Sequence, residues 1–187
     1  MPRLSLMAAS IRRRLRALRH DTRGVAATEF AMLLPLMVTL YLGCVEVSQA
    51  VAIDRKVSLT ARAVADLVSQ SSSITNLEML NILDATAAVV SPYNAATVEV
   101  VVSFIKLDAN KSATVVWSDA KNATARPKDQ TVTIPSGIAI PNSTIILSEV
   151  KYPYKPTIGY VITGTLNLTE KTYMQPRVQS TITRLAT

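Results

Sequence analysis

The sequence is poor in the residues that most enzymes and metal sites use. Its 187 residues include one histidine, His20, and one cysteine, Cys44. A single cysteine excludes a disulfide within the chain. A single histidine, placed near the N-terminus, leaves the rest of the chain without a Ser-His-Asp or Cys-His set and without a metal site built on His or Cys. We therefore expect a protein that is not an enzyme and that holds no cofactor or metal.

Glycine and aromatic residues are also scarce. The five glycines do not form a phosphate-binding loop. Aromatic residues make up only 5% of the chain, and nothing in it resembles a module that reads DNA or RNA. The net charge of +7 therefore needs another explanation, and we expect no nucleic-acid partner.

The positive charge is concentrated at the N-terminus. Residues 1–24 hold seven arginines and one aspartate, a net charge of +6, whereas residues 25–53 carry −2 and residues 54–187 carry +3. Basic residues directly before an apolar segment mark the cytoplasmic end of a membrane helix. This asymmetry predicts a cytoplasmic N-terminus and an extracytoplasmic C-terminal part.

An apolar segment follows the arginines. The sixteen residues from Phe30 to Val45 carry no charge, and a count from Val25 gives 21 residues with Glu29 as the only charge. A membrane-spanning helix needs about 20 residues. Pro35 lies inside the segment, where a membrane helix tolerates it with a kink.

The helical pattern does not stop at the end of the apolar segment. Apolar residues recur at spacings of four, three and four, which favours one continuous helix over about residues 26–69: they are Val57, Ala61, Val64 and Val68. We predict a leader at 1–24, a transmembrane helix at 25–50, an amphipathic continuation at 51–70 and an extracytoplasmic domain at 71–187. Two other interpretations stay open, a signal peptide cut after Ala50 and a twin-arginine signal at residues 12–14.

Glu29 is costly in an apolar segment, by about 2.5–3.5 kcal/mol if it lies deep. Three explanations remain: the carboxylate reaches the membrane interface, it is protonated, or it has a cationic partner. A cut after Gly24 would create an amine on Val25, four residues and one helical turn from Glu29. That amine is cationic at neutral pH, and it could pair within the chain or with a neighbouring subunit.

These residues carry a resemblance. Gly24 is followed after four residues by Glu29-Phe30, then by an apolar run with a proline, Gly43 and a second glutamate, Glu46. The pattern over residues 23–69 is similar to TadE-like proteins, the TadE/TadG family of pilin-like components of the Flp (tight adherence) pilus machinery.

The resemblance implies a pseudopilin in the bacterial inner membrane, with one span and a periplasmic C-terminal domain. It implies processing by a prepilin peptidase after Gly24, with Val25, Glu29 and Phe30 in recognition and assembly. Its partners would be other pilins or Tad components. The alternative is a periplasmic binding or adhesion module on a simple anchor or a cut signal.

The C-terminal part changes its periodicity. Thr75 and Glu78 fit a capping box, and a short helix should follow until Pro92, with its apolar face at Leu77, Leu80, Leu83, Ala87 and Val90. Alternating patterns then predict strands at 98–104, 114–118, 131–134, 144–154 and 166–174, the first two joined as a hairpin. The expected fold is α+β: a long N-terminal helix, a short helix and a small antiparallel sheet.

The other candidate sites are better explained by structural roles. Asp108, Asn110, Ser112 and Asp119 have calcium-loop spacing, but Ala113 replaces the required glycine, so a hairpin turn is favoured. Asn122 and Asn167 begin glycosylation tripeptides, which are common by chance. Tyr152 and Tyr154 share one strand face and should pack in the core. Glu46 either lies at the interface or pairs with a neighbouring subunit.

Overall fold

The computed structural model describes residues 23–156, 159 and 162–185. The chain divides into two compact units, Met1–Val45 and Glu46–Thr187, and each is considered by itself. The predictions for the basic leader, including residues 12–14 and His20, lie outside the described residues.

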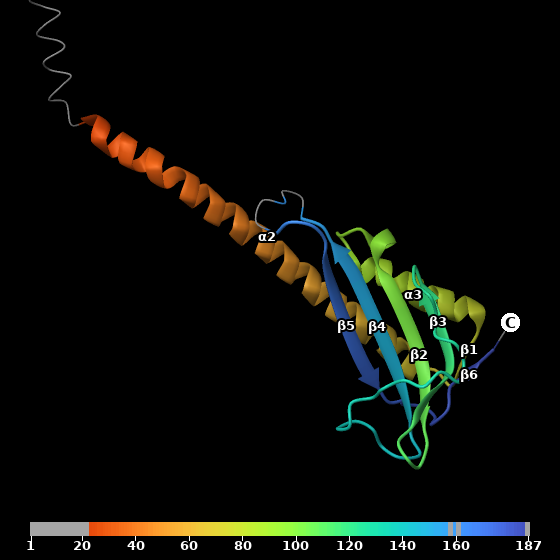
Figure 1. Ribbon diagram of the computed structural model, residues 1–187. Coiled ribbons are helices and arrows are strands. Elements are labelled where there is room, and N and C mark those ends of the chain that lie inside the picture. Colours follow the sequence, from red (N-terminus) through yellow and green to blue (C-terminus); the bar gives the residue numbers. More distant parts are fainter. Residues whose placement is uncertain (1–22, 157–158, 160–161, 186–187) are drawn as a thin grey trace, which may run out of the picture. The chain divides into compact units, whose positions relative to one another are not determined.

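One long helix, α2, runs from Arg23 to Ser69 (Figure 1). It confirms the continuous helix that the periodicity predicted, with Pro35 inside it. Within the described part of the chain, it is the one helix long and apolar enough to cross a membrane.

The part of α2 that belongs to the second unit buries one face. Its buried residues recur every three or four positions, so they form a stripe along the helix: they include Glu46, Ala50, Ile53, Val57, Ala61, Val64 and Val68. The four apolar residues predicted to share a face are all among them. The stripe begins at Glu46, five residues before the predicted start of the amphipathic half at residue 51.

The second helix, α3, spans Asn76–Val90. Its capping box is confirmed, because the Glu78 N–H donates to the Thr75 hydroxyl and the Thr75 N–H donates to the Glu78 carboxylate at 2.8 Å. The predicted apolar face was partly wrong. Leu83 and Val90 are buried as predicted, but Leu77 is 67% exposed and Leu80 is 58% exposed, and the helix buries Met79 and Thr86 in their place. The sheet contacts a face rotated from the leucine stripe.

Four antiparallel strands form the main sheet in the order β3-β2-β4-β5. The strands are β2 (Glu99–Leu107), β3 (Ala113–Lys121), β4 (Thr144–Tyr154) and β5 (Leu166–Met174). The hairpin of β2 and β3 is confirmed, as are the bounds of β4 and β5. Together with the two helices, this confirms the predicted α+β class.

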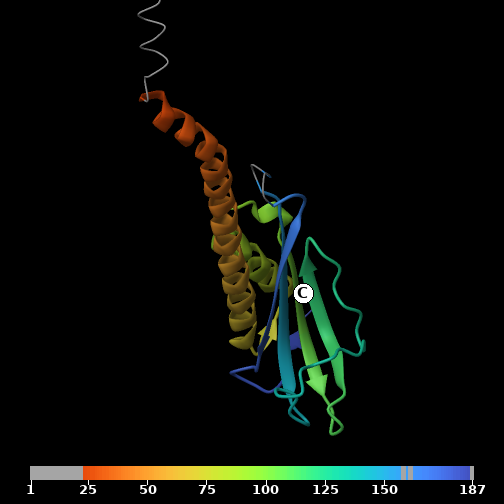
Figure 2. The same ribbon diagram turned by 60° about the vertical axis from the view of Figure 1, so that its left-hand side comes forward.

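Each face of the sheet has its own core. Alternate residues of β2 and β4, such as Val102, Phe104 and Ile146, point toward α3 and the 46–69 part of α2, and both views show these helices on one side of the sheet (Figures 1 and 2). On the other face, Ile105 and Leu147 belong to a smaller cluster that the loop after β3 covers with Val132 and Ile134. The predicted strand at 131–134 was wrong: only a single bridge forms, between Thr114 and Thr131, and the backbone hydrogen bonds of this segment to β3 reach no further than Val132.

The sequence patterns did not predict a second, two-stranded sheet. The strand β1 (Ser73–Ile74) pairs in parallel with β6 (Thr183–Arg184). Ile182, beside β6, is buried in the main core, and its carbonyl accepts a hydrogen bond from the Trp117 indole at 2.9 Å. The C-terminal segment thereby joins the end of α2 to β3.

Candidate processing and assembly site

The four residues predicted for processing and assembly lie together at the start of α2. Gly24, Val25, Glu29 and Phe30 fall within its first turns, and all are exposed. Val25 and Glu29 are four residues apart in a continuous helix, so their side chains lie on the same helix face. The Thr28 hydroxyl donates to the Val25 carbonyl oxygen at 2.8 Å.

Gly24 is not required by the packing of the described chain. A Cβ atom at this position would meet open space, and its φ lies outside the left-handed range that favours glycine. Glycine within a helix costs about 0.5–1 kcal/mol relative to alanine. The described part of the fold therefore gives no packing reason for a glycine at this position.

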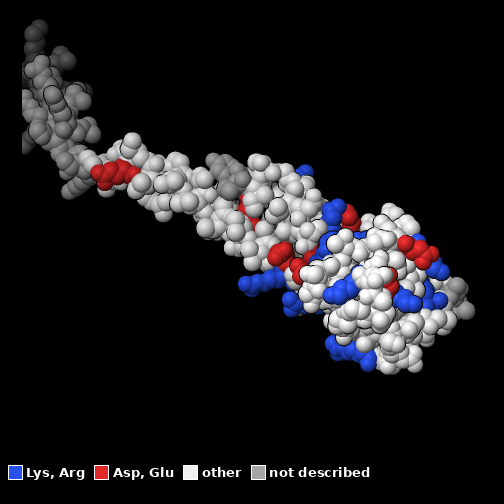
Figure 3. All heavy atoms as spheres, turned by 60° about the horizontal axis from the view of Figure 1, so that its bottom comes forward, with Lys and Arg blue, Asp and Glu red and all other residues white. Residues whose placement is uncertain are grey.

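The segment after Glu29 exposes apolar side chains around the helix. Phe30 is 56% exposed, and the other large apolar residues that remain exposed are Met32, Leu33, Leu34, Leu36, Met37, Val38, Leu40 and Tyr41. Figure 3 shows this stretch of helix as white, without basic or acidic atoms. A helix that is apolar on every side is stable only when lipid or other helices cover it.

Glu46 has a role that sequence reasoning did not resolve. Its side chain is only 1% exposed, and Oε2 accepts a hydrogen bond from the Ile162 N–H at 2.8 Å. The Tyr154 hydroxyl lies 3.4 Å from the Glu46 carbonyl oxygen and 3.4 Å from the Gln49 side-chain oxygen. Glu46 thus makes its contacts within the Glu46–Thr187 unit. Its spacing of four from Ala50 and seven from Ile53, on the buried stripe, is the signal that could have shown this.

Ala50, the predicted end of a cut signal peptide, lies in the middle of α2 and is buried in the core of the second unit. Cleavage after Ala50 would remove both Glu46 and Ala50 from that unit. A signal peptidase normally acts on an extended segment after the apolar region, and α2 has no such segment here.

The calcium-loop residues take structural roles instead. Asp108 Oδ1 accepts the N–H groups of Asn110 and Ser112 at 2.8 and 2.7 Å, which closes the hairpin turn. Asp119 forms an ion pair with Arg184 at 2.9 Å. Its carboxylate therefore joins β3 to β6. Among the residues that the structure describes, no group of three or more His, Cys, Asp or Glu side chains could hold a metal ion.

The remaining polar and aromatic candidates also have packing roles. The Asn122 amide donates to the carbonyl oxygens of Ala96 and Val98 at 3.1 and 2.8 Å, so it supports the start of β2. Asn167 is exposed on β5. Tyr152 and Tyr154 are buried in the main core, as their shared strand face predicted.

In a comparison with protein families, residues 24–66 match the family model described as TadE-like protein. The match confirms the resemblance over this segment. It indicates a protein associated with the Tad pilus, and the apolar helix is a candidate membrane anchor. Comparison with curated proteins and with solved structures finds no match.

Proposed function

We propose that this chain, whose residues 24–66 form a TadE-like segment, is a membrane-anchored, pilin-like component of Flp/Tad pilus assembly. The observation that carries the proposal is the junction at the start of α2. There an exposed carboxylate, Glu29, is followed by sixteen uncharged residues from Phe30 to Val45, whose large apolar side chains are left largely uncovered by the described residues. Such a helix needs neighbouring helices or lipid, and the carboxylate needs a cation.

Processing after Gly24 by a prepilin peptidase would supply that cation. Cleavage creates an α-amine on Val25, one helical turn before Glu29. The pair can form within one chain or between neighbouring chains. In apolar surroundings an unpaired Glu29 carboxylate would be strongly disfavoured. Pairing of Glu29 with the Val25 amine of a neighbouring chain would therefore favour one defined axial offset between the two helices. Lateral packing of the apolar segments would then hold the subunit in the assembly.

The direction of insertion follows from the charge. Seven arginines precede the apolar segment, so the N-terminus faces the cytoplasm and the Glu46–Thr187 unit lies in the periplasm. The buried position of Ala50 supports an uncut anchor over a signal peptide. The role is structural and not enzymatic, with other pilins or Tad components as partners.

The test combines the mature N-terminus with an assembly assay. Mass spectrometry of the membrane-purified protein should find Val25 as the first residue. Glu29→Ala should still be inserted but should fail to assemble with pilus components. Asp54→Ala is the matched control, because Asp54 is also an exposed acid on α2.

Two results would overturn the proposal. A mature chain that starts at Met1 or Val51 removes the proposed processing. Normal assembly of the Glu29→Ala variant would favour the alternative of a periplasmic binding or adhesion module on a simple anchor.

A further inference from the structure

The two edges of the main sheet differ. The β3 edge is covered by the loop that follows it: the Asp129 N–H donates to the Val115 carbonyl at 2.8 Å, and the Val132 N–H donates to the Ala113 carbonyl at 2.9 Å. At the opposite edge, β5 pairs only with β4. Within the part of the chain that the structure describes, no backbone hydrogen bond joins β5 to any other segment.

The free edge of β5 is regular. Its nine residues, Leu166–Met174, contain no proline, and they pair with β4 without a register shift. Proteins commonly protect a free edge with a bulge, a proline or a lysine. Lys171 is present and its side chain is 60% exposed, but its ammonium group is held 2.9 Å from Glu149 on β4. The outer N–H and C=O groups of β5 are therefore a template for another strand.

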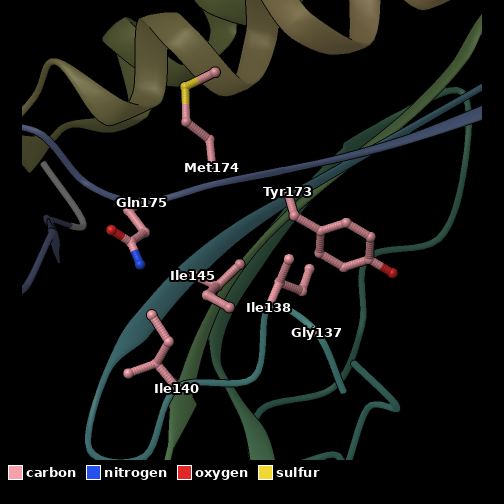
Figure 4. A pocket seen from close by; sticks show the side chains of 7 residues that line it. All are labelled: Gly137, Ile138, Ile140, Ile145, Tyr173, Met174 and Gln175. Carbon is pink, nitrogen blue, oxygen red and sulfur yellow. The ribbon is translucent and has the colours of Figure 1, made fainter. Parts of the chain in front are cut away.

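A hollow adjoins the C-terminal end of this edge. It has a volume of about 290 Å³. Tyr173 of β5 and Ile145 of β4 line it, together with Ile138 and Ile140 from the loop before β4. Figure 4 shows these side chains on one side of the sheet, while Met174 points to the other side, toward the helical ribbon. Ile140 is 51% exposed. The hollow can thus receive an aliphatic side chain from a strand laid along β5.

A charge at the same edge points to the chemistry of the occupant. Glu170 is half-buried, and no ion pair joins it to another of the described residues. It lies on the same side of the sheet as its register partner on β4, Val150, which is buried in the main core. A cation on the added strand would give Glu170 an ion pair.

We propose that the free edge of β5 accepts an extended segment of a partner polypeptide that carries an aliphatic and a basic residue three positions apart. Successive strand residues point to opposite faces, so Tyr173 and Glu170, three residues apart, lie on opposite faces. The aliphatic residue beside Tyr173 enters the hollow, and the basic residue faces Glu170. Main-chain hydrogen bonds supply affinity, while these two side chains supply selectivity. The proposal is independent of cleavage at Gly24.

Binding of short peptides to the uncleaved full chain in lipid nanodiscs tests the proposal. The probe is a labelled, capped, threonine-rich peptide with one isoleucine and one lysine three positions apart, made in both orders. Fluorescence anisotropy should show that at least one order binds. Replacing its lysine with glutamate should weaken binding about fivefold, and replacing its isoleucine with serine should weaken binding at least about tenfold.

Variants of the protein provide the reciprocal test. Glu170→Lys should reverse the preference, so that the glutamate peptide binds more tightly than the lysine peptide. Ile140→Asp should weaken every peptide that carries isoleucine. Asp54→Lys, a charge change on the exposed face of α2, is the control and should change none of the affinities.

Three results would overturn the proposal. The first is that no probe binds the wild-type chain. The second is that Glu170→Lys leaves the order of peptide affinities unchanged. The third is self-association of the chain through β5, detected as a disulfide between two copies of Asn167→Cys that the lysine peptide does not prevent; that result would assign the edge to a second copy.

Discussion

The carboxylate of Glu46 accepts a hydrogen bond from the backbone N–H of Ile162, with Oε2 and N 2.8 Å apart. The two residues are 116 positions apart in the sequence. The contact ties the first turn of the folded part of α2 to the loop between β4 and β5. A glutamate beside a predicted membrane segment is thus part of the folded core of the second unit.

Replacing Glu46 tests this contact. Glu46→Ala should lower the free energy of unfolding of the full chain by about 2 kcal/mol, because the Ile162 N–H loses its acceptor in a partly buried setting. Glu46→Gln retains an acceptor oxygen and should lose less. Denaturant unfolding in detergent, followed by circular dichroism, measures both. Equal effects of Glu46→Ala and the exposed control Asp54→Ala would contradict the assignment.

The hydroxyl of Tyr154 should make stability fall at alkaline pH. Burial, and then the nearby negative charge of Glu46, raise the pKa of Tyr154 above its ordinary value of 10.0. The folded state therefore holds the phenolic proton more tightly than the unfolded state does. The contribution of Tyr154 to the free energy of unfolding should be fully present below pH 10.0 and should be lost as the pH rises through the folded-state pKa.

Unfolding free energies measured against pH would show this loss. Tyr154→Phe should reduce the alkaline decrease, because the residue can no longer ionise. Tyr173→Phe, which removes the hydroxyl of a half-exposed tyrosine, is the control. An identical pH dependence for wild type and Tyr154→Phe would contradict the expected linkage.

Trp117 joins two parts of the second unit. Its ring stacks on Phe104 with centroids 5.6 Å apart, and its indole N–H donates to the Ile182 carbonyl at 2.9 Å. Trp117→Phe keeps an aromatic ring but removes the donor, so we expect a loss of about 1 kcal/mol. Unfolding by circular dichroism, together with faster proteolysis near residue 182, would detect the released C-terminal segment. Unchanged proteolysis would show that other contacts hold it.

A substitution at Gly24 tests the proposed processing. A side chain here would meet open space, and leucine favours a helix more than glycine does by about 0.8 kcal/mol. Gly24→Leu should therefore leave the helix intact but prevent the proposed cleavage, because the peptidase would meet a bulky side chain at the residue after which it cuts. Mass spectrometry of the mature protein is the measurement, and wild-type cleavage of Gly24→Leu would contradict the expected requirement.

Local patterns predicted the elements whose causes are local. The capping box of Thr75 and Glu78 marks the start of α3 because both hydrogen bonds close within four residues. The bounds of β4 and β5 follow from alternation and turn residues. The predicted strand at 131–134 failed because strand pairing depends on the partner, and this segment meets β3 only as far as Val132.

The face of α3 shows the same limit. Its sequence offers apolar residues on more than one side, so periodicity alone selected the leucines. The helix instead buries Met79 and Thr86 together with Leu83 and Val90. The choice of face is set by the shape of the sheet surface, which no local pattern contains.

The sequence by itself determined the arginine-rich leader, the uncharged run from Phe30 to Val45 and the spacing of Gly24, Val25 and Glu29, because charge, hydropathy and helical spacing are properties of neighbouring residues. Tertiary structure decided which strand became the free edge and where Glu46 points. Both depend on contacts between segments far apart in the chain, and the free energy of those contacts exists only once the sheet has formed.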